Sequence, residues 1–209
     1  SQSSGESNYP KVAVSSDGTV HAVWHDNTAG NYEVLYTRRG SDGTWSVPQN
    51  LSSSSERSYY PDVVAAADGS VHVVWYEEFI DYWEGILYAR CSTGGDCSDP
   101  VRLSYQYSDI WGSQLALGPD GSVHLVWSTN NVWYARRGTD GVWSVPEVVY
   151  PTIIIAGYVD PGLRVDSAGT AHIISSNGEV FYAQRTANGD WSDTVNASDT
   201  PFNSNSARL

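Results

Sequence analysis

The chain has 209 residues, of which 40% are hydrophobic and 12% aromatic, so it is long enough to bury a substantial core. Its formal net charge is −13, whereas phosphate binding needs a basic surface, so we expect neither nucleic acids nor anionic membranes as partners. No apolar segment approaches the length of a membrane span, so we expect no membrane insertion.

A short segment recurs along the chain at a spacing of about 50 residues, which is typical of a repeat architecture. It begins with Asp-Gly or Ala-Gly and continues with a histidine among small, β-branched and apolar residues. The copies lie at 17–24, 68–75, 120–127 and 168–175. Asp-Gly favours a tight turn and the β-branched residues favour a strand, so each copy predicts the turn and second strand of a hairpin.

Two further segments complete each repeat. A third strand is expected at 34–38, 86–90, 132–136 and 180–184. A fourth strand is expected at 45–48, 143–146 and 191–194, where a proline suits an edge position because no ladder hydrogen bond is lost there. Four-stranded antiparallel units repeated around an axis describe an all-β β-propeller without helices. We predict blades at 9–52, 60–104, 111–149 and 157–197.

The two ends of the sequence both resemble internal parts of a repeat. Residues 205–209 match 161–165, the first strand of a repeat, so four complete repeats are followed by one extra strand. Residues 1–10 match the linker at 52–61, and both segments end in Tyr-Pro. We therefore expect 1–209 to be a segment of a larger propeller, or a subunit that self-associates through free blade edges.

The second repeat carries the two cysteines. Cys97 stands where the other repeats have Trp45, Trp143 and Trp191, and Cys91 precedes it across the turn. A disulfide bond here would contribute about 2 kcal/mol in the chain-entropy model, and it would indicate an oxidising compartment and a secreted, extracellular protein. The alternative is a pair of reduced thiols that face each other on a hairpin.

Aromatic and acidic residues gather in the loop between the second and third strands of the second repeat. Aromatic rings beside hydrogen-bond acceptors suit the apolar faces and hydroxyl rims of sugars. The alternative is a solvated hairpin that covers its neighbour. The candidate ligand-binding residues, which include two from the following linker, are Glu77, Glu78, Asp81, Tyr82, Trp83, Asp109 and Trp111.

The recurring histidines suggest a ring of metal ligands at first sight. They lie on the second strand of each repeat, and not on the innermost strand, so we expect them to hydrogen-bond backbone between blades. The loop at 26–33 has oxygen ligands but no recognised calcium spacing. We expect no metal and no cofactor. The histidines are His21, His72, His124 and His172.

The turn sequences at 41–46 and 139–144, Ser-Asp-Gly-Thr-Trp-Ser and Thr-Asp-Gly-Val-Trp-Ser, resemble the Asp-box (BNR) repeats of the sialidase-like β-propeller superfamily. The resemblance covers all the repeats and implies a propeller fold. The sequence lacks the Phe/Tyr-Arg-Ile-Pro segment of sialidases. Its arginines Arg38, Arg90 and Arg136 recur at one repeat position, which is typical of scaffold residues, so a non-sialidase member is expected.

Two classes of function fit these observations. The first is a secreted binding module that recognises a glycan or a protein partner through the variable loops. The second is a carbohydrate-active enzyme, a glycoside hydrolase or a lyase. Hydrolysis requires two carboxylates that flank one bond, and several acidic pairs fit this requirement without one of them standing out.

Overall fold

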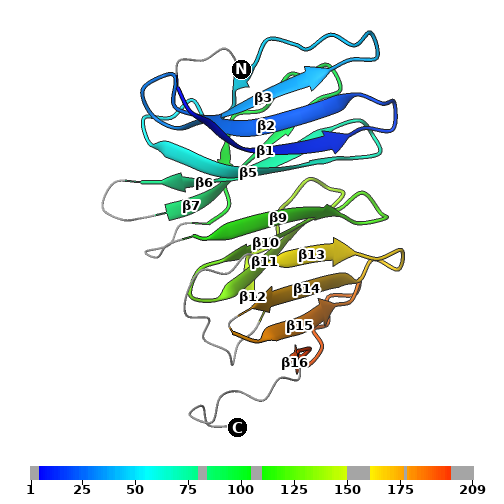
Figure 1. The fold of residues 1–209 in the computed structure, drawn as a ribbon. Helices are drawn as coiled ribbons and strands as arrows, with labels where there is room; N and C mark the ends of the chain where they lie inside the picture. Colours follow the sequence, from blue (N-terminus) through cyan, green and yellow to red (C-terminus); the bar gives the residue numbers. More distant parts are fainter. Residues whose placement is uncertain (1–4, 80–83, 105–109, 150–160, 177, 199–209) are drawn as a thin grey trace.

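The computed structural model describes residues 5–79, 84–104, 110–149, 161–176 and 178–198. These residues form sixteen strands and no helix (Figure 1). The strands form separate four-stranded antiparallel sheets, which confirms the predicted all-β architecture. Within the described ranges there is accordingly no helix long and apolar enough to cross a membrane.

Each sheet takes its strands from one repeat, in chain order. The first sheet comprises β1 (Ser7–Val14), β2 (Val20–Asp26), β3 (Glu33–Arg39) and β4 (Gln49–Asn50). The second comprises β5 (Arg57–Ala65), β6 (Val71–Glu78), β7 (Glu84–Cys91) and β8 (Val101–Arg102). The third comprises β9 (Gly112–Leu117), β10 (Val123–Ser128), β11 (Val132–Arg137) and β12 (Glu147–Val148). The fourth comprises β13 (Gly162–Val165), β14 (Ala171–Ser176), β15 (Val180–Arg185) and β16 (Val195–Asn196).

The extra strand expected at 205–209 lies outside the described residues. The fourth strands are only two residues long and lie at the sheet edges. The prolines expected inside them stand before them instead, as Pro48 before β4 and Pro146 before β12 show. A proline there ends the irregular segment and leaves both residues of the short strand free to pair.

The first hairpin of each repeat turns where the sequence predicts. Gly18 and Gly121 both have φ of +84°, a conformation that a side chain disfavours. The preceding aspartate fixes the turn, because Asp120 Oδ1 accepts a hydrogen bond of 3.0 Å from the backbone N–H of Ser122. These turns set the register of the strands that carry the core.

Consecutive sheets pack face to face, with one apolar cluster in each interface. The clusters include the fully buried Trp75 and Trp127. The first strands β1, β5, β9 and β13 contact one another in sequence order, so they lie side by side along the stack of sheets (Figure 1). The β1–β2 and β3–β4 turns, with their counterparts, lie on what we call the turn side. The β2–β3 loops and the connections between sheets lie on the opposite, loop side.

The repeat histidines make contacts that differ from the expected backbone contacts between blades. Each ring Nδ1 lies 2.7–2.8 Å from a tyrosine hydroxyl on the third strand of its own sheet, for example His124 and Tyr134. The other ring nitrogen contacts a nearby side chain, such as Ser122 Oγ at 2.9 Å from His124. The expectation was wrong because neighbouring strands already use the backbone groups, whereas Tyr and His face each other across β10 and β11.

The expected bridge between Cys91 and Cys97 is present. The two residues form an isolated β-bridge, and Arg137 and Trp143 form the equivalent bridge in the third sheet. The disulfide therefore replaces an arginine–tryptophan pair of the other repeats. Cys91 is fully buried in the cluster between the first and second sheets.

Candidate ligand-binding site

Two tyrosines on the loop side have an unusual backbone conformation. Tyr9 and Tyr60 have φ of 52° and 49°, although neither is a glycine. Each precedes a proline, Pro10 or Pro61, and the strand register shifts at both places. Such a conformation costs on the order of 1–3 kcal/mol, so strain of this kind is often retained where it positions a functional side chain.

Both bulges bring tyrosine rings around one buried histidine. The ring of His25, only 3% exposed, lies at the end of β2. Four tyrosine rings have centroids 5.2–5.6 Å from it, and a fifth, Tyr76, stacks on two of these at 5.4 and 6.0 Å. We call this group the tyrosine cluster: Tyr9, His25, Tyr32, Tyr59, Tyr60 and Tyr76.

Hydrogen bonding determines which ring nitrogen of His25 carries the proton. Its Nδ1 accepts a hydrogen bond of 3.2 Å from the backbone N–H of Tyr60. Burial lowers the pKa of His25 and the neighbouring Asp26 opposes this shift, so the ring is neutral near pH 7. Because Nδ1 must accept, the proton of the neutral ring sits on Nε2, and that nitrogen acts as a donor.

A small hollow lies beside the cluster at the ends of the first strands. It has a volume of about 80 Å³ and takes walls from Tyr9, Lys11, Tyr60 and Trp111. Three consecutive sheets thus contribute an aromatic residue from within or directly before their first strands. Tyr9 is 54% exposed, so its ring is accessible from solvent.

Acidic groups surround the cluster. The hydroxyl of Tyr32 donates to Glu6 at 3.0 Å, and this bond raises the pKa of Tyr32. Glu78 forms an ion pair with Arg57 at 3.8 Å. Glu77 is buried and accepts a hydrogen bond of 2.9 Å from Ser58, and its burial raises the pKa of its carboxyl group.

Three of the seven predicted ligand-binding residues lie in the described part of the chain. Trp111 lies in the hollow, Glu78 lies at the neighbouring end of β6, and Glu77 is buried beneath it. Asp81, Tyr82, Trp83 and Asp109 lie outside the described residues. Sequence reasoning did not identify the tyrosine cluster, although the repeated Tyr-Pro pairs were a signal for it. Their role depends on the bulges, which strand alternation does not reveal.

The cluster offers phenol rings, hydroxyl groups and one buried N–H donor. Within the described parts of the chain, no group of three or more His, Cys, Asp or Glu side chains is placed to hold a metal ion. The site is therefore suited to stacking and hydrogen bonding.

The chain matches no protein-family model and no curated protein. Its fold is similar to a Hadza microbial sialidase at a TM-score of 0.64 and 10% identity, over 92% of this chain and 46% of that one. A lectin from Burkholderia pseudomallei matches at a TM-score of 0.69 and 11% identity, over 91% and 56% of the two chains. An ulvan lyase of polysaccharide lyase family PL25 matches at 0.67 and 10%, over 90% and 56%. These likenesses support a sialidase-like fold, and this chain spans about half the length of these structures.

Proposed function

We propose that the chain belongs to a secreted glycan-binding protein of sialidase-like fold, and that the tyrosine cluster binds the sugar. The observation that carries this proposal is the convergence of Tyr9, Tyr60 and Trp111 from three sheets around one hollow beside His25. Aromatic faces stack on the C–H faces of sugar rings, and the tyrosine hydroxyls and the His25 N–H can hydrogen-bond to the sugar hydroxyls. The similar folds include a lectin, a sialidase and a polysaccharide lyase, which supports a carbohydrate-related role.

The charges around the cluster favour a neutral glycan. Glu6 and Glu78 lie beside the rings, and Arg57 is already paired with Glu78. Among the described residues that line the hollow, Lys11 is the basic one. The chain as a whole carries a net charge of −13, so a polyanionic glycan would be repelled.

The state of His25 favours binding over proton abstraction. A lyase or hydrolase that used this ring as a base would need a free lone pair. The lone pair of Nδ1 is occupied by the Tyr60 N–H, and Nε2 carries the proton. Catalysis by a carbohydrate-active enzyme is the competing proposal, and cleavage of the bound glycan would distinguish it from binding alone.

We further infer that the four sheets are consecutive blades of a β-propeller and that the turns at 41–46 and 139–144 are Asp-box turns. The open face of the first sheet supports this arrangement. It has an apolar groove of about 510 Å³, and its lining includes Trp24, Trp45 and Pro48. In the inner interfaces the counterpart of Trp45 packs on a tyrosine of the preceding sheet, as Trp143 does on Tyr88 at 5.2 Å. The groove therefore fits a further sheet of the same repeat type, in the same protein or in a second copy.

A glycan array tests the binding proposal. Wild type should bind a neutral glycan, and Tyr9→Gly should lower its affinity at least about tenfold, because a central stacking ring is lost. Glycine also relieves the positive φ of Tyr9, so the free energy of unfolding should stay within about 1 kcal/mol of wild type.

The matched control is Trp45→Ala, which removes a ring that is 52% exposed but lies outside the tyrosine cluster. It should leave glycan binding unchanged. Equal loss in both variants, or no glycan signal in wild type, would contradict the proposal. Mass spectrometry of the bound glycan after incubation would reveal cleavage, and a cleaved product would favour the enzyme.

A further inference from the structure

The interface between the third and fourth sheets contains a carboxylate with two donors. Arg185 Nη2 lies 3.0 Å from Glu147 Oε1, and Trp191 Nε1 donates to Glu147 Oε2 at 2.7 Å. Trp191 also packs edge-on against Tyr134 at 5.4 Å, and the Arg185 guanidinium lies 5.2 Å from the centre of the same ring. The Glu147 carboxylate thus accepts from the Trp191 indole N–H and pairs with the Arg185 guanidinium. Both of these donors pack against the ring of Tyr134.

The interface between the second and third sheets has the same donors in the same arrangement. Trp143 packs edge-on against Tyr88 at 5.2 Å, and the Arg137 guanidinium lies 5.8 Å from the centre of that ring. Val101 pairs with Tyr88, in the register position that Glu147 has opposite Tyr134. A valine therefore stands where the other interface has its carboxylate.

Neither donor has an acceptor among the described residues. Trp143 Nε1 is buried and has no hydrogen-bond partner among the described residues. Arg137 forms no ion pair within the described parts of the chain. In the interface between the first and second sheets the problem does not arise, because Cys91 and Cys97 replace the arginine and tryptophan.

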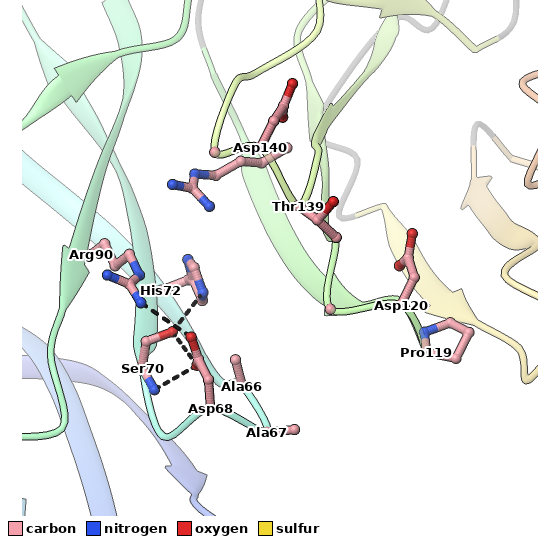
Figure 2. Close-up of a pocket in the computed structure, with 13 residues that line it drawn as sticks. Ala66, Ala67, Asp68, Ser70, His72, Arg90, Pro119, Asp120, Thr139 and Asp140 are labelled. Carbon is pink, nitrogen blue, oxygen red and sulfur yellow. Dashed lines mark hydrogen bonds and ion pairs between the residues drawn. The ribbon is translucent and has the colours of Figure 1, made fainter.

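Arg137 is accessible from a cavity of about 560 Å³ on the turn side. Figure 2 shows Asp68, His72 and Arg90 on one wall, with Asp120 and Asp140 on the other. A cavity of this volume can hold a single sugar ring.

The other charged groups of this cavity have partners. Asp68 pairs with Arg90 at 3.2 Å, and Asp120 pairs with Arg136 at 2.5 Å. Asp140 Oδ1 accepts the backbone N–H of Val142 at 3.0 Å. His72, whose burial lowers its pKa to about 4, is neutral at pH 7. The guanidinium of Arg137 is thus the cation available to an incoming anion.

We propose that this interface binds the carboxylate of a small organic acid, which takes the place that Glu147 occupies between the next two sheets. Arg137 would donate two N–H groups to the carboxylate, and the Trp143 indole would donate a third. Guanidinium and carboxylate match each other in planar, two-point geometry, and a ligand oxygen would satisfy the buried indole N–H. The carboxylate could be free or carried on a sugar ring.

Titration of the 209-residue chain with sodium acetate and with sodium glucuronate tests the proposal, with sodium chloride at equal ionic strength as the reference. The indole N–H resonance of Trp143, assigned with Trp143→Phe, is followed by ¹⁵N NMR. A saturable shift with both acids indicates that the carboxylate alone is recognised. A shift with glucuronate alone indicates that the ring is also required. No shift beyond the chloride reference with either acid overturns the proposal.

Val101→Glu supplies an internal carboxylate at the position of Glu147. This variant should weaken binding of the acids at least tenfold without lowering the melting temperature, because the introduced carboxylate restores the arrangement of the neighbouring interface. Val101→Thr, which adds no charge, should bind as wild type does. Unchanged affinity in Val101→Glu would also overturn the proposal. Tyr9→Gly should leave this titration unaffected, so the result is independent of glycan binding at the tyrosine cluster.

Discussion

The buried histidines His72 and His124 should make the protein sensitive to mild acid. Burial lowers the pKa of each ring from 6.5 to about 4, and nearby arginines add to the shift. The unfolded chain therefore binds more protons than the folded chain between pH 6.5 and 4, so stability falls as the pH falls through this window. Each histidine contributes a slope of up to about 1.4 kcal/mol per pH unit.

The loss between pH 7 and pH 4.5 should be about 2.5 kcal/mol per histidine and about 5 kcal/mol for the pair. This is comparable with the whole stability of a typical domain. Urea unfolding at pH 7, 6, 5 and 4.5 measures it. The double variant His72→Gln/His124→Gln should reduce the slope by about 2–3 kcal/mol per pH unit.

The control for loss of the tyrosine contact is His172→Gln, which removes a ring with the same contact from a half-buried position, and its free energy of unfolding at pH 7 is compared with that of the double variant. The turn aspartates affect stability in a separate pH range. Hydrogen bonds lower the pKa of Asp68 and Asp120 below 3.8, so their contribution to the free energy of unfolding is lost only at a pH below that value. An equal slope in wild type and in the double variant would refute the reasoning.

Three further results are expected. Reduction of the Cys91–Cys97 bridge should lower the free energy of unfolding by about 2 kcal/mol and add two daltons of mass, and an unchanged mass would show that no bridge exists. Gly121→Ala should destabilise the chain by roughly 1–2 kcal/mol in thermal unfolding, because φ is +84° there while a Cβ would meet no neighbour. Gly94→Ala, at a turn glycine without positive φ, should have little effect, and equal losses would show that backbone strain is not the cause. Trp45→Glu should reduce association of the chain in light scattering, because it places a charge in the open groove of the first sheet, and a wild type that is already a monodisperse monomer would contradict that proposal.

The sequence predicts those features that depend on local chemistry. The Asp-Gly pairs identify the hairpins because glycine tolerates the positive φ and the aspartate bonds the turn backbone. The disulfide follows from repeat alignment, because Cys97 takes the position of a tryptophan that bridges to the third strand. Both inferences need only the repeat and the chemistry of neighbouring residues.

The sequence does not predict features that depend on two sheets at once. The tyrosine cluster forms because β1 and β5 bulge at Tyr9 and Tyr60, which turns both rings away from strict alternation. Arg137 and Trp143 lack the acceptor that Glu147 provides in the next interface. This difference is recognised only from the strand register, in which Val101 takes the position of Glu147. Local sequence patterns predict neither the tyrosine cluster nor the missing acceptor between the second and third sheets.

Glycan binding at the tyrosine cluster is tested most directly at His25. Long-range ¹⁵N NMR at pH 7 should show a neutral ring with its proton on Nε2, as the Tyr60 N–H bond to Nδ1 requires. Addition of the neutral glycan selected on the array should shift the Nε2 resonance of His25 in a saturable way and leave that of His72 unchanged. Binding of the glycan without any change at His25, or a His25 ring that carries its proton on Nδ1, would contradict the account.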